Sequence, residues 1–182
     1  MLYIKPCCAS AAYVMFEVNL YEPKLFQDTT VESENPGMNN AFGGIAFLGN
    51  TRMYGEQWLY TRPDFSKMPE MLDRPVRKAV WHLPKLGGAD VRLTAHEASA
   101  RFCSFGSNWT NKIAVAALET ESCACNGYVD LDVTHILTDS KTGFIKRSEG
   151  WVVRTKVKGS GFAAVATGDS YYAPQILELN FQ

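Results

Sequence analysis

The stretch Lys78-Ala-Val-Trp-His-Leu83 alternates between two sets of side chains. Ala79, Trp81 and Leu83 fall on one face of an extended chain, and Val80 and His82 fall on the other. Because successive side chains of a β-strand point to opposite faces, this period of two predicts a strand with one face in a core. We expect Trp81 to occupy a core position.

The same alternation recurs on both sides of this stretch. It is found in residues 12–20, 90–95, 128–133, 150–156, 161–167 and 176–181. Turn-forming residues separate these runs, as at Asn35-Pro36-Gly37 and Gly87-Gly88. Many short strands with few helical segments predict an all-β, antiparallel β-sandwich. One short helix is expected over residues 134–140, with Asp132 or Thr134 as its N-cap.

The strand phases also predict which side chains are buried. In each run, one register places the apolar set on a single face. The residues expected to be mostly buried are Val31, Phe65, Ala79, Trp81, Leu83, Leu93, Leu131, Val133, Leu177 and Leu179.

Composition excludes several classes of protein. The 182 residues include 18 Lys and Arg against 19 Asp and Glu, for a formal net charge of −1. Since binding to nucleic-acid phosphates needs a basic surplus, we expect no nucleic-acid partner. No run approaches the roughly 18 apolar residues of a membrane span. Residues 1–12 also lack the continuous apolar segment of a secretory signal peptide.

The five cysteines are Cys7, Cys8, Cys103, Cys123 and Cys125. Their spacing does not match the paired cysteines of a zinc site. Two interpretations stay open: reduced thiols that pack as small apolar side chains, and disulfides, some of them between chains. All five are disulfide candidates.

No catalytic motif surrounds the histidines His82, His96 and His135, and we expect neither an enzyme nor a cofactor. Asp130 and Asp132 share one face of a strand and form a weak candidate Ca²⁺ site. The favoured alternative is that Asp132 stabilises the turn into the short helix.

Aromatic side chains could stack on sugar rings. Trp109 lies between polar residues in an expected loop, so it is the best exposed candidate, followed by Tyr171 and Tyr172. In a sandwich, however, aromatic side chains more often belong to the core.

The order of several segments resembles the DNRLRE-type domain, a jelly roll related to a carbohydrate-binding module family of bacterial surface proteins. The similar segments are residues 28–31, 60–69, 76–83, 109–111, 128–137, 150–152 and 174–179. The resemblance covers residues 28–181 and implies a jelly-roll sandwich. It leaves an extra N-terminal segment, whose Cys7-Cys8 pair is loosely similar to the connector of spore-appendage subunits.

These observations divide the chain into an N-terminal extension, residues 1–25, and a jelly-roll domain, residues 26–182. The extension carries an apolar stripe expected to act as an assembly strand: Val14, Phe16, Val18 and Leu20. The favoured hypothesis is a structural subunit that polymerises with itself into an extracellular filament, appendage or surface layer, joined by strand exchange and intersubunit disulfides. The alternatives are a carbohydrate-binding or adhesive surface module and a virion decoration protein.

Overall fold

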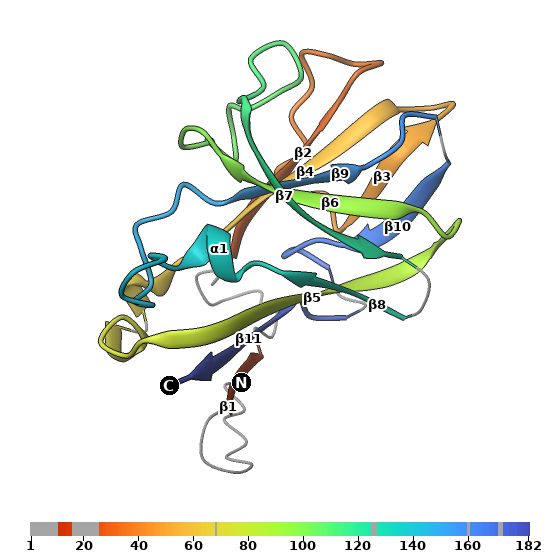
Figure 1. The fold of residues 1–182 in the computed structure, drawn as a ribbon. Coiled ribbons are helices and arrows are strands. Elements are labelled where there is room, and N and C mark those ends of the chain that lie inside the picture. The colour runs from red at the N-terminus through yellow and green to blue at the C-terminus, as the bar shows by residue number, and fades with distance from the viewer. Residues whose placement is uncertain (1–10, 16–25, 68, 125–126, 160, 171–172) are drawn as a thin grey trace.

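The computed structural model describes residues 11–15, 26–67, 69–124, 127–159, 161–170 and 173–182. Every strand pair in these ranges is antiparallel (Figure 1). The strands are β1 (Ala11–Met15), β2 (Phe26–Glu32), β3 (Ile45–Thr51), β4 (Gly55–Pro63), β5 (Val76–Gly88), β6 (Arg92–Ala98), β7 (Val115–Cys123), β8 (Tyr128–Asp132), β9 (Trp151–Thr155), β10 (Phe162–Ala166) and β11 (Ile176–Phe181). The helical turns are η1 (Phe65–Lys67), η2 (Pro69–Met71) and α1 (Thr134–Leu137). No helix in the described ranges is long and apolar enough to cross a membrane.

The long strand β5 belongs to both layers of the sandwich. From Val76 to Pro84 it pairs with β11 and β8, and from Lys85 to Gly88 it pairs with β10. The first sheet is therefore β1–β11–β5–β8. The second sheet runs from β10 through β3, β4, β9 and β6 to β7, and β2 also pairs with β4. The chain is an all-β antiparallel sandwich of the jelly-roll type, as the sequence predicts.

The core lies between the two sheets. Trp81 of β5 and Trp151 of β9 meet there with ring centroids 5.4 Å apart, and both rings are fully buried. The expected core list is confirmed with one qualification, since Phe65 is only partly buried while it packs against the core. Val31 is buried in a different cluster, on the outer face of the second sheet.

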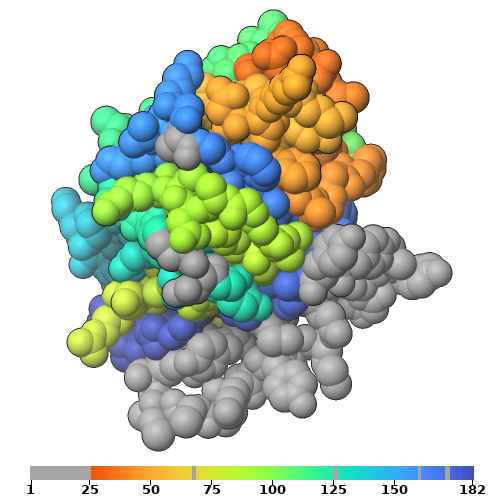
Figure 2. Space-filling view, turned by 90° about the vertical axis from the view of Figure 1, so that its right-hand side faces the viewer, coloured from red at the N-terminus to blue at the C-terminus, as the bar shows by residue number. Residues whose placement is uncertain are grey.

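Segments distant in sequence close the right-hand side of the molecule. Figure 2 shows the yellow-green turn after β5 next to blue segments near the C-terminal end of the chain. The Ala89 amide donates to the Phe162 carbonyl at 2.8 Å, which ties this turn to β10. The contact joins the two sheets at the point where β5 changes partner.

The short helix differs from the sequence prediction in its end and its cap. It spans Thr134–Leu137 and its N-cap position is Val133, so neither Asp132 nor Thr134 is the N-cap. The Asp132 carboxylate nevertheless accepts hydrogen bonds from the Thr134 amide, at 3.1 Å, and from its hydroxyl. The predicted role of Asp132 in the turn is confirmed. The helix is short because Thr138 is already extended.

Strand β7 has no counterpart among the sequence predictions. Its side chains are exposed or half-buried along the whole strand, and Leu118 is 64% exposed. A strand that pairs on one side only and faces solvent has no need for an alternating apolar pattern. The alternation of apolar and polar residues in the sequence therefore does not reveal β7.

A pair of leucine truncations tests the location of the core. Leu59→Ala removes a fully buried side chain between the sheets and should lower the free energy of unfolding by about 2–5 kcal/mol. Leu118→Ala is the matched control, because its side chain is exposed and the change should stay within about 0.5 kcal/mol. Urea denaturation followed by tryptophan fluorescence measures both. Equal losses in the two variants would contradict the core assignment.

Candidate functional site

The edge of the first sheet is formed by β1, the described part of the N-terminal extension. It pairs with β11 over five residues, from Ala11 opposite Asn180 to Met15 opposite Ile176. Val14 of the expected assembly strand is the register partner of Leu177. Phe16, Val18 and Leu20 lie outside the described residues. The extension thus adds its strand to the same chain's sheet in this single-chain structure.

A histidine joins the three strands next to this edge. His82 of β5 contacts the Asp130 carboxylate of β8 at 2.7 Å and the Glu178 carboxylate of β11 at 3.2 Å. Glu178 is in turn the register partner of Tyr13 in β1. These contacts run across the outer face of the first sheet, in line with the expectation that His82 faces solvent or an interface.

The weak candidate Ca²⁺ site is not assembled. The Asp130 carboxylate contacts His82, and the Asp132 carboxylate accepts hydrogen bonds from Thr134. Within the described ranges, no group of three His, Cys, Asp or Glu side chains lies close enough to hold a metal ion. Asp130 and Asp132 share a strand face, but their carboxylates contact different partners and do not form a Ca²⁺ site together.

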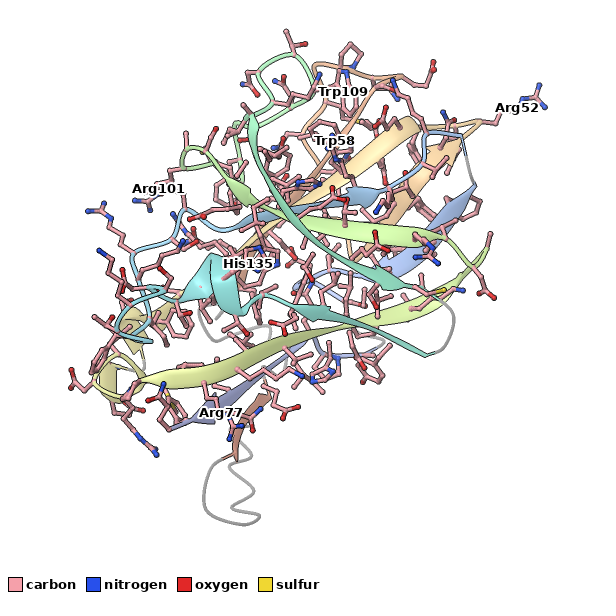
Figure 3. All side chains as sticks on the ribbon, in the orientation of Figure 1. Arg52, Trp58, Arg77, Arg101, Trp109 and His135 are labelled. Carbon is pink, nitrogen blue, oxygen red and sulfur yellow. The ribbon has the colours of Figure 1, made fainter. Side chains whose placement is uncertain are left out.

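The Trp109 ring packs against neighbouring side chains. Its ring packs against Trp58 with centroids 5.2 Å apart, and Figure 3 shows the two labelled rings close together. The Lys112 ammonium lies 4.1 Å from the Trp109 ring centroid. Trp109 is half-buried, whereas Trp58 and Trp151 are buried, so Trp109 is the most exposed of these tryptophans and its contact with a glycan stays a prediction. Tyr171 and Tyr172 lie outside the described residues.

Trp109 is half-buried because it packs against a second apolar cluster, which lies on the outer face of the second sheet. Residues 99–114 cover this face, and the buried members of the cluster are Val31, Trp58, Tyr60, Ala98, Phe102 and Val152. Burial raises the pKa of the Tyr60 hydroxyl to about 12, and this hydroxyl donates to the Ile113 carbonyl at 3.2 Å. The covering loop is therefore a packed part of the fold.

A groove opens beside this cluster, between residues 41–42 and 101–105. It has a volume of about 630 Å³. Buried Ala41 and Phe102 line it together with the rings of Phe42 and Phe105, which are 73% and 70% exposed. The two exposed rings lie 5.4 Å apart, centroid to centroid. The charged residues along the groove are Asp28, Asp64 and Arg101.

Side-chain amides hold the groove in shape. The Asn39 amide group donates to the carbonyls of Ser104 and Ser107, both at 2.7 Å, which fastens one loop to the other. Asn35 and Asn40 donate to the buried Glu32 carboxylate of β2, at 2.8 Å and 3.2 Å. The groove is therefore largely preformed.

Sequence reasoning missed Phe42 and Phe105 as surface residues. The signal was present, because both lie next to glycines within turn-rich stretches, Asn39-Asn-Ala-Phe-Gly43 and Cys103-Ser-Phe-Gly106. An aromatic residue in such a stretch is either covered by another segment or exposed, and the sequence does not decide between the two.

The structure describes two of the five cysteines, Cys103 and Cys123. Cys103 lines the groove and is the free cysteine of the described ranges, where it is exposed. Cys123, at the end of β7, is disulfide-bonded. Cys7, Cys8 and Cys125 lie outside the described residues, so the pairing scheme and any intersubunit disulfide stay predictions.

His96 is buried within the second sheet. Its Nε2 atom accepts from the Arg154 Nε–H group at 3.3 Å, so the ring proton resides on Nδ1 and points to the Ala116 carbonyl at 3.1 Å. Burial, opposed by that carbonyl, lowers the pKa of His96, and the nearby Arg154 acts in the same direction as burial while Glu119 opposes it. A neutral, hydrogen-bonded imidazole here has a structural role.

Comparison with known proteins adds no family assignment. No protein-family model matches the sequence, and no curated protein is significantly similar to it. The resemblance to the DNRLRE-type domain remains a prediction.

The buried histidine generates a prediction on pH. Because the pKa of His96 is lower in the folded protein than its ordinary value near 6.5, the unfolded chain binds the proton more tightly. The contribution of His96 to stability is present above about pH 6.5 and is lost as the pH falls below it. His96→Gln removes this titration, so unfolding free energies measured between about pH 7 and pH 5 should fall less steeply than for the wild type. Equal slopes would contradict the prediction.

Proposed function

We propose that this protein is a structural subunit of a self-assembling extracellular filament, appendage or surface layer, and that its N-terminal extension mediates assembly. One observation carries the proposal: β1 is an edge strand at the N-terminal end of the chain, and it pairs with β11 alone within the described residues. A strand at this position can leave one sheet and complete the equivalent sheet of another copy with the same hydrogen bonds.

Such an exchange preserves the contacts that β1 makes in the single chain. The β1–β11 ladder is the same within a chain and between chains, so exchange costs little in contacts. When the exchanged strand joins successive copies head to tail, and the rotation between copies does not close a ring, the product is an open filament. Disulfides from Cys7 or Cys8 would then make the contacts hard to reverse.

The carbohydrate-binding alternative has weaker support. Its best-placed residue, Trp109, packs against Trp58 and lies beneath the Lys112 ammonium, which leaves less of the ring for stacking on a sugar. We keep a glycan partner as a secondary hypothesis.

Deletion of residues 1–15 tests the assembly role. The variant lacks β1 but keeps β2 to β11, so it should remain folded and stay monomeric where the wild type assembles. Circular dichroism and analytical ultracentrifugation measure the two properties. A folded variant that still forms the wild-type assemblies would overturn the proposal.

Replacing two cysteines tests whether disulfides stabilise the assembled subunits, separately from whether the subunits assemble. The Cys7→Ser, Cys8→Ser double variant keeps β1 and should still assemble. Its assemblies should dissociate in denaturant, whereas those of the wild type should withstand it until a reducing agent is added. Electron microscopy and non-reducing gel electrophoresis give the readouts, and denaturant-resistant assemblies of the double variant would rule out locking by these thiols.

A further inference from the structure

Strand β7 forms a free edge of the second sheet. It pairs with β6 and, among the residues that the structure describes, with no other strand. Figure 1 shows β7 in front of β6. Beside it, a pocket of about 750 Å³ is lined by Leu118 and Thr120 of β7 and by residues of the segment 132–143. This side of β7 is therefore open to another strand.

The charges on β7 do not protect this edge against pairing. Edge strands are commonly protected by unpaired charges, by prolines or by short length. The strand β7, Val115–Cys123, contains neither proline nor lysine. Its two carboxylates belong to Glu119 and Glu121, and both are engaged within the chain. Glu121 contacts Arg92 at 2.7 Å, and both carboxylates contact Lys156. Their charge is therefore balanced on the face of the strand that they occupy.

We propose that β7 pairs antiparallel with β7 of a second copy, with Leu118 opposite Leu118 of that copy. The lateral role of this contact rests on the proposed function, because it joins neighbouring filaments or rows of a layer whose copies are connected by β1. Both copies use the same surface, so the contact has two-fold symmetry. Its main-chain hydrogen bonds extend the second sheet from one copy into the next.

The sequence of β7 is complementary to itself in this register. A two-fold axis perpendicular to the sheet pairs residues from the same face of the strand. Every carboxylate of the two strands then lies opposite an apolar side chain, and no like charges are directly opposed. The opposed pairs are Leu118–Leu118, Ala117–Glu119, Ala116–Thr120 and Val115–Glu121. The Leu118 side chain, which is 64% exposed in the single chain, is covered by its counterpart.

Other registers are less favourable. With Glu119 on the axis, two Glu119 carboxylates would be opposed, and with Thr120 on the axis, Glu119 would face Glu121. With Ala117 on the axis, a shorter stretch pairs and Leu118 loses its counterpart. An axis within the plane of the sheet exchanges the two faces of the strand, and it would bring the exposed leucine against the carboxylate face. The register centred on Leu118 is therefore the longest that keeps the carboxylates apart.

A single pair of β7 strands is a weak contact. Two paired strands are only marginally stable in water, so isolated copies are expected to stay apart at the low concentrations of a sedimentation experiment. Copies connected by strand exchange present many β7 edges, and the weak contacts between two such rows add up. The expected product is a ribbon or layer of laterally joined filaments.

A photo-crosslink between isotopically distinct copies tests the pairing. Copies of normal isotopic composition carry Ala117→p-benzoylphenylalanine. They are mixed with ¹⁵N-labelled copies at about 1 mM, where weak pairs are populated, and irradiated. Mass spectrometry should find the labelled position attached to the ¹⁵N-labelled peptide that contains Glu119. Copies that lack residues 1–15 should give the same adduct, because they keep β7. Adducts only within one copy, or only on other surfaces, would overturn the proposal.

Charges introduced at Leu118 test the register. Leu118→Lys in both copies places like charges on the axis and should lower the yield of the adduct about fivefold or more, as should Leu118→Glu in both copies. Mixing Leu118→Lys copies with Leu118→Glu copies opposes unlike charges and should restore the adduct, and a failure to restore it would rule out this register. Met53→Lys is the matched control, because Met53 is 71% exposed and lies outside β7, and it should leave the yield unchanged.

The outcomes separate this contact from strand exchange by β1. By electron microscopy, Leu118→Lys should form single filaments without lateral association, whereas deletion of residues 1–15 should abolish the filaments and keep the β7 adduct. Lateral association of Leu118→Lys equal to that of Met53→Lys would overturn the lateral role. If the wild type does not assemble, the proposed function fails, and the adduct alone decides whether β7 pairs.

Discussion

The contact between Trp81 and Trp151 is the constraint on which the rest of the fold depends. Trp81 belongs to the first sheet and Trp151 to the second, and their rings meet edge to face with centroids 5.4 Å apart. Both indole N–H groups are buried without a hydrogen-bond acceptor in the described ranges, which costs free energy. The sandwich tolerates that cost because each ring buries an area that few other side chains match. The separation of the two sheets is therefore set where these rings meet.

The outer face of the second sheet, which points away from these two rings, is also apolar. Trp58 and Tyr60 alternate with core residues along β4, so β4 is buried on both sides. Residues 99–114 cover this face, and hydrogen bonds from Asn39 tie them to the neighbouring loop. The groove with its two exposed phenylalanines is a consequence of this arrangement, since it forms at the margin of the covering loop.

The proposed assembly depends on one edge of this sandwich. The edge of the first sheet is completed by β1, and beside it the His82 ring, which contacts the Asp130 and Glu178 carboxylates, ties β11 to β5 and β8. Beside the outer face of the second sheet, the groove is lined by the exposed rings of Phe42 and Phe105. The assembly that we propose requires β1 to leave this edge and to complete the same edge of another copy.

The amino-acid sequence by itself determined the fold class and most of the core. The alternation around Trp81, Leu131 and Leu177 follows from the strand period of two, which is a local property and is readable without tertiary structure. The turn role of Asp132 is local as well, since its carboxylate contacts a residue two positions away. Strand β7 escaped prediction because an exposed edge strand needs no apolar alternation.

Only the tertiary structure decided how the surface residues are used. Trp109 and Phe42 both occur in loop-like sequence, yet Trp109 is half-buried against Trp58 while Phe42 is exposed. Likewise, Asp130 and Asp132 share a strand face, but each contacts a different partner. Whether such a side chain is buried, and what it contacts, depends on segments far apart in the chain. A local sequence pattern does not show which distant segment packs against it.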